Sequence, residues 1–495
     1  MINFISGIKT AYRTFQYLKS GRSFKAGIQN RLSSDWITSI IKSNEDIKAH
    51  WSTLVSRSRD LAKNNSAYKK WLKLIEDNVI GHNGVRLQLK SKNPDGTQDT
   101  YANTHIETHF REWGRKRNGY CTVGKKLSWI GLQKLAVRTI AVDGEVFIQR
   151  IKGTMPGNPY AYSLKILDST DCDIEYCVAQ LANGNRIVMG VELDSDDNVV
   201  AFHFKKSGSG YAAKHTRIPA DQIIHIYDEE FSGQVRGFPR ASAALLDINM
   251  AEGFKEAALV NARAGAAQMG FWKNTGAGGG GRKGKDGDVG GLPVTDSRPG
   301  TFSIIPKGWE FEKYDPSYPT TAYEPFMRDM HRDIANGLNT SYNNHFNDLV
   351  GVSFSSLRGG TLTERDAWKG SQQNIIESLH EFVFRDWLTM FLLTPLSNLP
   401  YAKFAKFLAD TWLPRRWPWV DPLKDAKANV LMVENGLANP LSIIAEQGDD
   451  PDDVFDGLDA YLERFGDILK KRGLTFSTFK AITSQILTEE DKDNE

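Results

Sequence analysis

Two groups of acidic residues are the first features of this sequence that could support chemistry. Asp143 and Glu145 flank a glycine, and a second acidic run contains Asp168, Asp171, Asp173 and Glu175. Carboxylates that converge on one point can hold two metal ions for phosphodiester cleavage, usually with a lysine close by. Position 147, however, is Phe where a D/E-x-K nuclease motif has Lys. The pattern therefore favours structural carboxylates, and a metal-dependent nuclease that uses these acids is the alternative.

Histidines and cysteines offer a second kind of metal ligand. His105 and His109 lie one helical turn apart with Glu107 between them, but the H-E-x-x-H pattern of zinc proteases is absent. Three cysteines are too few for a disulfide framework, and reduced thiols are the simpler prediction. They do not form a pair at finger-like spacing with other ligands, so no metal and no cofactor is expected; the residues are Cys121, Cys172 and Cys177.

A glycine-rich insert over 274–291 is the third candidate, because glycine loops can cradle phosphates. The P-loop pattern fails, since Arg282 and Lys283 stand where Lys and Ser/Thr belong. Residues 279–284 do spell G-x-G-x-x-G, but neither a buried strand before them nor a helix after them is predicted. The insert is therefore interpreted as a flexible loop. No serine occupies a G-x-S-x-G elbow either.

Composition limits the class of protein. The 495 residues suffice for several folding units, and 62 Lys+Arg against 60 Asp+Glu give a net charge of +2. Tight binding to nucleic acid usually needs a basic excess, so any DNA contact should be loose, local or transient. The first residues lack a continuous apolar core, so no secretory signal is predicted. The apolar stretch 382–396 contains Arg385 and Asp386, which favours a buried helix and no membrane span.

The elements that must position these residues fall into a mixed α+β, mostly helical chain. A basic amphipathic arm occupies 1–33, and three helices follow over 34–80. A strand at 85–89 and helices at 105–117 and 129–142 precede a region with period-two alternation. The predicted strands of that mostly antiparallel block are 145–151, 162–167, 186–193, 199–204 and 222–227. Together these elements predict an α+β domain over 34–238.

Two helices beyond this domain lack the large apolar side chains that a core requires. One is an alanine-rich run over 239–271 and the other spans 323–338, with short strands at 301–305 and 309–311 between them. Small side chains let helices approach closely, so these helices are expected to pack against copies of themselves. The residues chosen for that contact are Ala258, Ala262 and Ala266. A polar loop over 341–360 and a long core helix over 363–393 follow.

The order of these parts resembles the portal proteins of tailed bacteriophages, and most closely the lambda-type portal family. The resemblance spans about 31–474. Its local marks are Arg57-Ser-Arg-Asp-Leu-Ala-Lys-Asn-Asn, Ile75-Glu-Asp-Asn-Val-Ile-Gly, Ala141-Val-Asp-Gly-Glu, Pro219-Ala-Asp-Gln-Ile-Ile-His-Ile, Gln234-Val-Arg-Gly-Phe-Pro-Arg, Asp315-Pro-Ser-Tyr-Pro, Trp417-Pro-Trp-Val-Asp-Pro and Asn435-Gly-Leu. The N-terminal thirty residues and the last twenty match no pattern of the family.

The resemblance implies a non-enzymatic protein that forms a dodecameric ring at one capsid vertex of the virion, around a channel for double-stranded DNA. By that resemblance the chain divides into an arm, a wing, a two-helix stem with a small β-containing clip inserted in it, a tunnel loop, a long helix that returns to the wing, a helical crown and a tail. The arm is 1–33 and the wing is 34–238. The two stem helices are 239–271 and 323–340, with the clip 272–322 between them. The tunnel loop is 341–360, the long returning helix 361–420, the crown 421–473 and the tail 474–495.

The family also implies the partners and the residues that meet them. Expected partners are the terminase large subunit, the major capsid and scaffolding proteins, the head-completion or connector proteins, and DNA held without sequence preference; assembly would take place in the host cytoplasm. Residues expected at the clip are Arg282, Lys283, Lys285, Asp286 and Asp288. Residues expected to line the channel are Asn343, Asn344, His345, Phe346, Asn347, Asp348, Leu349, Val350, Ser353, Ser355 and Arg358. A monomeric binding module is a third possibility.

Overall fold

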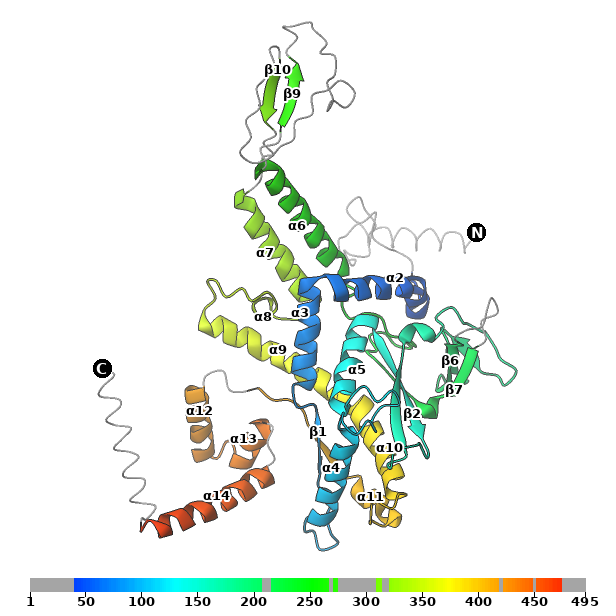
Figure 1. Ribbon diagram of the computed structural model, residues 1–495, viewed down its shortest axis with the longest axis vertical. Coiled ribbons are helices and arrows are strands. Elements are labelled where there is room, and N and C mark those ends of the chain that lie inside the picture. Colours follow the sequence, from blue (N-terminus) through cyan, green and yellow to red (C-terminus); the bar gives the residue numbers. More distant parts are fainter. Residues whose placement is uncertain are drawn as a thin grey trace, which may run out of the picture.

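The chain forms a body of helices and sheets, a projecting helix pair and a small helical group beside the body (Figure 1). The computed structural model describes residues 40–206, 215–266, 270–274, 309–313, 320–417, 422–447 and 451–473. Strands and helices are both present and helices predominate, which confirms the mixed α+β prediction. The arm, the clip residues 275–308 and the tail 474–495 lie outside the described residues.

Helices form the first layer of the body. α2 (Ser43–Asn64) and α3 (Ser66–Ile75) meet at Asn65, whose side chain caps α3 by accepting from the Tyr68 amide at 2.9 Å. The π-helical turn η2 (Glu76–Ile80) extends α3 and ends at Gly81, where φ is +76°. α4 (Thr100–Gly114) and α5 (Trp129–Asp143) follow, close to the predicted 105–117 and 129–142.

Two antiparallel sheets form the rest of the body. β2 (Glu145–Lys152) is the centre of a three-stranded sheet with β3 (Tyr162–Leu167) and β8 (Ile223–Tyr227) at its sides. The second sheet has the order β4-β5-β6-β7. Its strands are β4 (Arg186–Val188), β5 (Val191–Leu193), β6 (Val199–Lys205) and β7 (His215–Pro219). All these named strand pairs are antiparallel, which agrees with the predicted mostly antiparallel block.

The second sheet corrects one sequence prediction and adds a strand. The single strand predicted over 186–193 is a hairpin, because Met189 and Gly190 have φ of +51° and +80° and reverse the chain between β4 and β5. Strand β7 was not predicted, since its sequence His-Thr-Arg-Ile-Pro lacks apolar alternation and ends in proline. A tight approach elsewhere in the wing explains one glycine. A Cβ at Gly144 would lie 2.1 Å from the Phe238 carbonyl carbon, so only glycine fits there.

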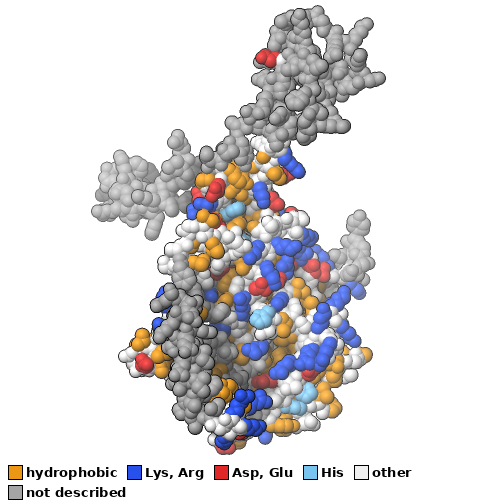
Figure 2. Space-filling model, turned by 60° about the vertical axis from the view of Figure 1, so that its left-hand side comes forward, with side chains coloured by type: hydrophobic (Ala, Val, Ile, Leu, Met, Phe, Trp, Pro, Cys, Tyr) orange, Lys and Arg blue, Asp and Glu red, His pale blue; other side chains and the backbone are white. Residues whose placement is uncertain are grey.

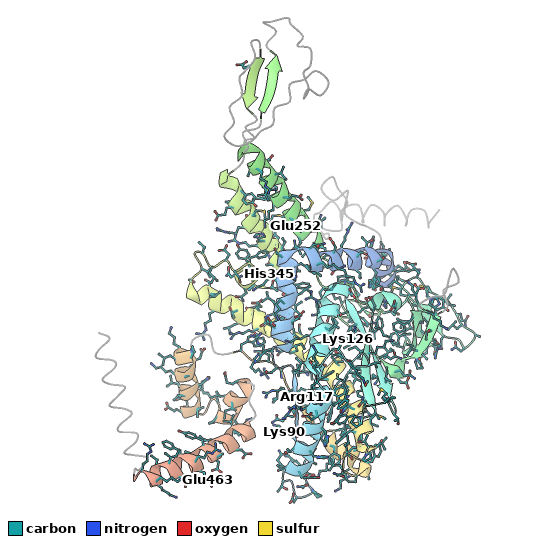
Figure 3. All side chains as sticks on the ribbon, viewed as in Figure 1. Lys90, Arg117, Lys126, Glu252, His345 and Glu463 are labelled. Carbon is teal, nitrogen blue, oxygen red and sulfur yellow. The ribbon has the colours of Figure 1, made fainter. Side chains whose placement is uncertain are left out.

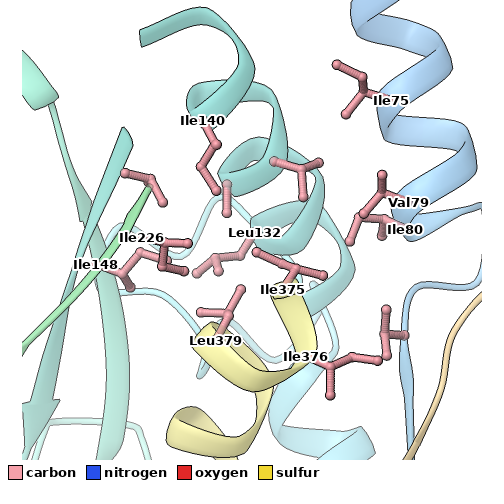
Figure 4. Close-up of a cluster of buried hydrophobic side chains, with 14 of the residues drawn as sticks. Ile75, Val79, Ile80, Leu132, Ile140, Ile148, Ile226, Ile375, Ile376 and Leu379 are labelled. Atoms are coloured by element: carbon pink, nitrogen blue, oxygen red, sulfur yellow. The ribbon is translucent and has the colours of Figure 1, made fainter. Parts of the chain in front are cut away.

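A single large core joins segments that are far apart in the sequence. α9 (Phe354–Ile375), the π-helical turn η5 (Ile376–His380) and α10 (Glu381–Leu392) form one long rod that packs beside α5 and the first sheet. Figure 4 shows isoleucines and leucines from this rod, from α3 and η2, from α5 and from β2 and β8 meeting in one cluster. The rod is therefore the core helix predicted over 363–393.

The rod begins earlier than predicted. Its first helix starts at Phe354, nine residues before the predicted start at Thr363, and the glycines at 359 and 360 lie within a helix. The actual cap is Ser353, whose hydroxyl accepts from the Ser356 amide at 3.2 Å. A short helix, α8 (Tyr342–Phe346), also occupies part of the range predicted as a loop. The irregular segment that remains is 347–353.

The projecting pair consists of α6 (Leu245–Ala266) and α7 (Thr320–Gly337). The predicted helix over 239–271 is too long at both ends: residues 240–244 form turns, and Gly270 and Phe271 belong to strand β9 (Gly270–Asn274). β9 pairs antiparallel with β10 (Trp309–Lys313), which covers the predicted 309–311, whereas the strand predicted at 301–305 lies outside the described residues. Close packing at the base is visible where a Cβ at Gly337 would lie 3.0 Å from the Ala244 Cβ.

Two remaining parts complete the chain. β1 (Arg86–Leu89) lies where a strand was predicted and pairs with β11 (Asp410–Leu413), which returns the chain to the wing. The helical group beside the body contains α12 (Pro422–Glu434), α13 (Pro440–Gln447) and α14 (Pro451–Lys471). None of the described residues of α12 is buried. This group therefore gains little stability from the chain's own core.

Candidate channel loop and subunit-contact surfaces

The segment from Thr340 to the start of α9 is held against the body by a buried histidine. His345, only 2% exposed, lies with Nε2 2.8 Å from the carbonyl oxygen of Ala67 and Nδ1 3.1 Å from the Thr340 hydroxyl. Burial lowers the pKa of His345, so the neutral ring donates to Ala67 and accepts from Thr340. His345 was predicted to line the channel; the structure makes it an anchor for α8 instead.

Polar contacts within the chain stiffen the rest of this segment. The Asn344 amide donates to Glu364, and burial raises the pKa of that carboxyl. Asp348 accepts from the Tyr342 hydroxyl at 2.5 Å and from the Val350 amide at 3.1 Å, and these hydrogen bonds lower its pKa. Phe346 stacks on His331 with ring centroids 4.2 Å apart. The segment is thus built from local bonds that hold one shape.

Only the tip of this segment presents side chains to solvent. Leu349 and Val350 are 59% and 82% exposed, and Ser353 and Ser355 are exposed as well. Arg358 lies in α9, where its guanidinium donates to Asp425 of α12 at 2.6 Å. Both charged residues predicted for the loop, Asp348 and Arg358, therefore have partners in the same chain. We call residues 347–353 the channel-loop tip.

The helix pair α6–α7 has one covered and one uncovered side. Phe254 of α6 packs on Tyr323 and Phe326 of α7, with ring centroids 5.7 Å and 5.1 Å apart. Leucine, methionine and valine side chains of α6 remain exposed; they are Leu246, Met250, Leu259 and Val260. We call these four residues the stem stripe. Figure 2 shows apolar side chains among charged ones on the described part of this pair, and many Lys and Arg side chains over the body.

Two of the alanines chosen from the sequence differ in their exposure. Ala258 is buried within the chain, whereas Ala262 is exposed, and the side chain of Ala266 lies outside the described ones. A large residue at position 258 would therefore disturb the chain's own helix pair before it could meet a neighbouring subunit. The five clip residues Arg282, Lys283, Lys285, Asp286 and Asp288 all lie outside the described residues.

The acids of the nuclease hypothesis are held by arginines. Arg59 of α2 donates to both oxygens of Asp143, at 2.8 Å from Nε and 2.6 Å from Nη2, and reaches Asp168 at 2.7 Å. Although partial burial opposes it, the hydrogen bonds from Arg59 and Thr170 lower the pKa of Asp168. These two carboxylates share one guanidinium, as in a structural ion-pair network.

Glu145 is the centre of a second and fully buried network. Its carboxylate accepts from Arg236 at 2.5 Å and lies 2.8 Å from Nε2 of His225, and both Glu145 and Arg236 are 0% exposed. The Arg236 guanidinium carbon lies 5.2 Å from the Trp51 ring centroid and 5.3 Å from that of Phe147. Burial opposes ionisation, but Arg236 and His225 outweigh it and lower the pKa of Glu145. The phenylalanine at position 147 is therefore one wall of an ion-pair site.

The remaining candidates are also explained by local structure. Asp173 accepts from His215 at 2.9 Å and Lys205 at 3.2 Å, while Asp171 ends a turn and Glu175 pairs with Lys48 at 3.6 Å. The rings of His105 and His109 pack on Phe391, and Cys121 and Cys172 are buried while Cys177 is exposed. Within the described residues no group of three His, Cys, Asp or Glu side chains could hold a metal ion. No helix in the same residues is long and apolar enough to cross a bilayer.

Comparison with known proteins decides the family. The family model for phage portal proteins of the lambda family matches residues 29–372. This chain belongs to that family. It is also 32% identical over 485 residues to a probable portal protein of Halomonas phage phiHAP-1, which covers 96% of this chain and 92% of the relative. Portal proteins are structural, non-enzymatic components of the bacteriophage virion, so the nuclease alternative is wrong.

Solved structures of gene transfer agent (GTA) particles are also similar to this portal protein. A chain in the neck of an empty GTA particle matches with a TM-score of 0.45 and 14% identity, covering 81% of this chain and 93% of that one. A chain in the neck of a native GTA particle matches with a TM-score of 0.44 and 12% identity over the same shares.

The structural ion pairs that sequence reasoning missed lie inside the family marks. Arg59 and Arg236 belong to the quoted stretches beginning at Arg57 and Gln234, and their partners Asp143 and Glu145 belong to the stretch beginning at Ala141. Three marks of this portal protein thus meet in one place. The order of the marks gave no sign of that contact; a search for cations that balance the buried acids could have found it.

Proposed function

We propose that copies of this portal protein assemble into a ring at one capsid vertex, with a channel through which double-stranded DNA enters during packaging and leaves at ejection. In that ring the α6–α7 pair is the stem, the body is the wing and α12–α14 form the crown. Membership of the lambda portal family supports the proposal. The elongated shape of the chain, with the helix pair projecting from the body, suits a subunit that lies beside its copies (Figure 1).

The observation that carries this proposal is the stem stripe. Leu259 and Val260 are 56% and 57% exposed, and Leu246 and Met250 are exposed on the same helix at a spacing of one turn. Leu246, Met250 and Val260 fall on one face of the helix at about 100° per residue, and an exposed apolar face of this kind marks a contact with another protein. The chain's own helix α7 contacts α6 through Phe254. A neighbouring copy of the stem is the partner that would cover the stripe in every subunit.

The channel-loop tip supports the second half of the proposal, which concerns DNA. Each phosphate neutralised by a free cation adds to binding and would slow passage. At the tip, Asp348 is engaged by Tyr342, and the nearest arginine in α9, Arg358, is engaged by Asp425. What remains exposed is uncharged, namely Asn347, Leu349, Val350, Gly351 and Ser353. Such a surface fits a lining past which DNA slides.

The partners proposed for this ring follow from the family. The terminase large subunit and later the head-completion proteins would dock on the clip, residues 272–322, through Arg282, Lys283, Lys285, Asp286 and Asp288. Capsid and scaffolding proteins would surround the wing while the head assembles in the host cytoplasm. DNA would be held without sequence preference.

Particle mass and shape test the ring directly. The full chain, purified after expression alone and after co-expression with its capsid protein, is expected to give annular particles in negative-stain images and one high-mass species in mass photometry. Monomers under all conditions, including co-expression, would refute the ring. A dimer without annular images would do the same, because a closed two-subunit contact leaves no channel.

A further inference from the structure

A small cleft lined by arginines lies where the wing meets the helical group α12–α14. Its volume is about 160 Å³, and it is formed by the turn 80–84, by β1, by the segment after β11 and by Gln447 of α13. Three of its lining residues are Arg86, Arg415 and Arg416, and none of the described lining residues is acidic. We call these three residues and the space between them the arginine cleft.

One arginine of the cleft is fixed in place before any ligand arrives. Arg415 donates to the carbonyl oxygen of Asp77 and to Asn78 Oδ1, the latter at 3.2 Å, and its guanidinium lies 5.9 Å from the Trp417 ring centroid. Gly81 makes room for it, since a Cβ there would lie 3.0 Å from the Arg415 Cβ. A site with a pre-ordered donor loses less entropy on binding than one built from free side chains.

The positive charge of the cleft is not balanced locally. Among the described residues no carboxylate forms an ion pair with any of the three arginines, and Arg86 and Arg416 are exposed without a hydrogen-bond partner. The guanidinium carbon of a fourth arginine, Arg365, also lies 5.9 Å from the Trp417 ring centroid. Burial lowers the pKa of Arg365, and the nearby charge of Arg415 adds to that shift.

The basic surface continues away from the cleft along strand β1. Alternate residues of a strand face the same side, so Arg86 and Gln88 share one side of β1, and Lys90 and Lys92 follow the strand along the chain. Figure 3 shows Lys90 on the side of the wing that faces α13 and α14. A continuous polyanion can follow such a row, whereas a single small anion would occupy only the cleft.

We propose that the arginine cleft binds a backbone phosphate of double-stranded DNA, with the lysines that follow β1 contacting the phosphates beside it. Guanidinium groups match phosphate oxygens in a two-bond geometry, which favours a cluster of arginines for this ligand. The inference rests on the proposed function only for the source of the DNA. It adds a holding site outside the channel, in contrast to the channel-loop tip, whose charges are engaged within the chain.

Binding of a short random-sequence duplex to the full chain, measured over a series of salt concentrations, tests the site. The variant is Arg86→Gln with Arg416→Gln, because neither side chain has a partner whose loss would unfold the protein. The matched control is Arg117→Gln with Lys126→Gln, which removes two exposed cations that do not line the cleft. Each lost phosphate contact should reduce the salt slope by about 0.9, with roughly tenfold weaker binding, and the control should change both by less.

Further arms identify what occupies the cleft. Inorganic phosphate should raise the melting temperature of the unmodified chain and not that of the Arg86→Gln, Arg416→Gln variant. Equal loss of DNA binding in variant and control would overturn the proposal, as would protection by phosphate without any difference in DNA binding. Binding that emerges only when Asp449, Asp450, Asp452 and Asp453 are changed to Asn would assign the cleft to that acidic segment instead. Negative-stain images of the same samples report ring formation separately, so failure of the ring and failure of the cleft are distinguishable.

Discussion

Two parts of this portal protein differ in how they are stabilised: the body, which we assign to the wing, and the helix pair α6–α7, which we assign to the stem. In the wing, charged groups that enter the interior have partners there: Glu145 meets Arg236, and Asp143 meets Arg59. In the stem, one face of α6 remains apolar and uncovered. An isolated wing therefore satisfies its own buried groups, whereas an isolated stem does not cover its apolar surface.

The helical group α12–α14 resembles the stem in this respect. Exposed apolar side chains recur along α14, among them Leu458, Tyr461 and Leu462, and α12 has no buried residue among those described. This difference separates residues that stabilise the folded chain from residues that we expect to contact other subunits. Changes in the wing should appear as loss of folding, and changes in the stem as loss of assembly by a folded chain.

The largest effect is expected from charge placed in the stem stripe. Leu259→Glu with Val260→Glu puts two carboxylates into the proposed contact between copies, where they would be desolvated without partners. Ring formation should be lost, with only low-mass particles in mass photometry, while circular dichroism and thermal unfolding of the wing stay unchanged.

A matched change in the wing is the control for this experiment. Val199 of β6 is an exposed apolar residue, 42% exposed, and Val199→Glu should leave both folding and assembly intact. If the stem variant still forms rings, the stripe does not face a neighbouring subunit. If Val199→Glu abolishes them instead, the wing and not the stem carries the contact.

The next largest effect is expected when the buried ion pair of the wing is broken. Arg236→Ala leaves the Glu145 carboxylate buried without its guanidinium, which should cost about 3–5 kcal/mol of unfolding free energy. Denaturant unfolding measures the loss. The direct effect should be a less stable chain, and any loss of assembly should follow from that instability. Arg240→Ala is the matched control: its partly exposed pair with Asp228 should contribute only about 0–1 kcal/mol. Similar losses in both variants would contradict the special role given to the Glu145 site.

Sequence patterns predicted the elements that carry strong periodicity. The strand 162–167 and the helix beginning at Trp129 agree with the structure, because apolar alternation and a serine cap are local signals. Local signals also explain two errors. Two glycines at 359 and 360 favoured a loop that is helical, and the reversal at Met189 is invisible to alternation since both flanking strands are apolar.

Contacts between distant segments could not be predicted in the same way. Arg59 and Asp143 are 84 residues apart, and Arg236 and Glu145 are 91 apart, so no spacing rule joins them. His345 was chosen for the channel because its neighbours are polar; its partner, the Ala67 carbonyl, belongs to α3. The packing of the core decides such pairings, and packing is a property of the whole fold.

A third prediction uses pH to separate folding from assembly. His380 is fully buried beside Trp129 and Trp412, donates from Nδ1 to the Ile375 carbonyl at 3.0 Å, and burial lowers its pKa to about 4. The unfolded chain therefore binds a proton first as pH falls below about 6.5. Stability should decrease from there down to about pH 4, by roughly 3 kcal/mol in total.

The variant His380→Phe keeps an aromatic ring between the two tryptophans and removes the proton. Its unfolding free energy should depend less on pH across that window than the free energy of the unmodified chain, as measured by denaturant unfolding at several pH values. An identical pH dependence in both proteins would show that His380 does not titrate as its burial requires.

The smallest effect on stability is expected at the channel-loop tip. Val350→Ser with Leu349→Ser changes two exposed side chains that bury little apolar surface, so unfolding free energy should change by less than about 0.5 kcal/mol. Rings should form at normal yield, because the stem stripe is untouched. Packaging or retention of DNA in the head should decrease, measured as the fraction of filled particles.

His345→Ala is the contrasting variant, since it removes the anchor to Ala67 and should destabilise α8. A normal fraction of filled particles in the tip variant would show that the loop does not line the channel. Unchanged stability in His345→Ala would show that the anchor does not hold the loop in place.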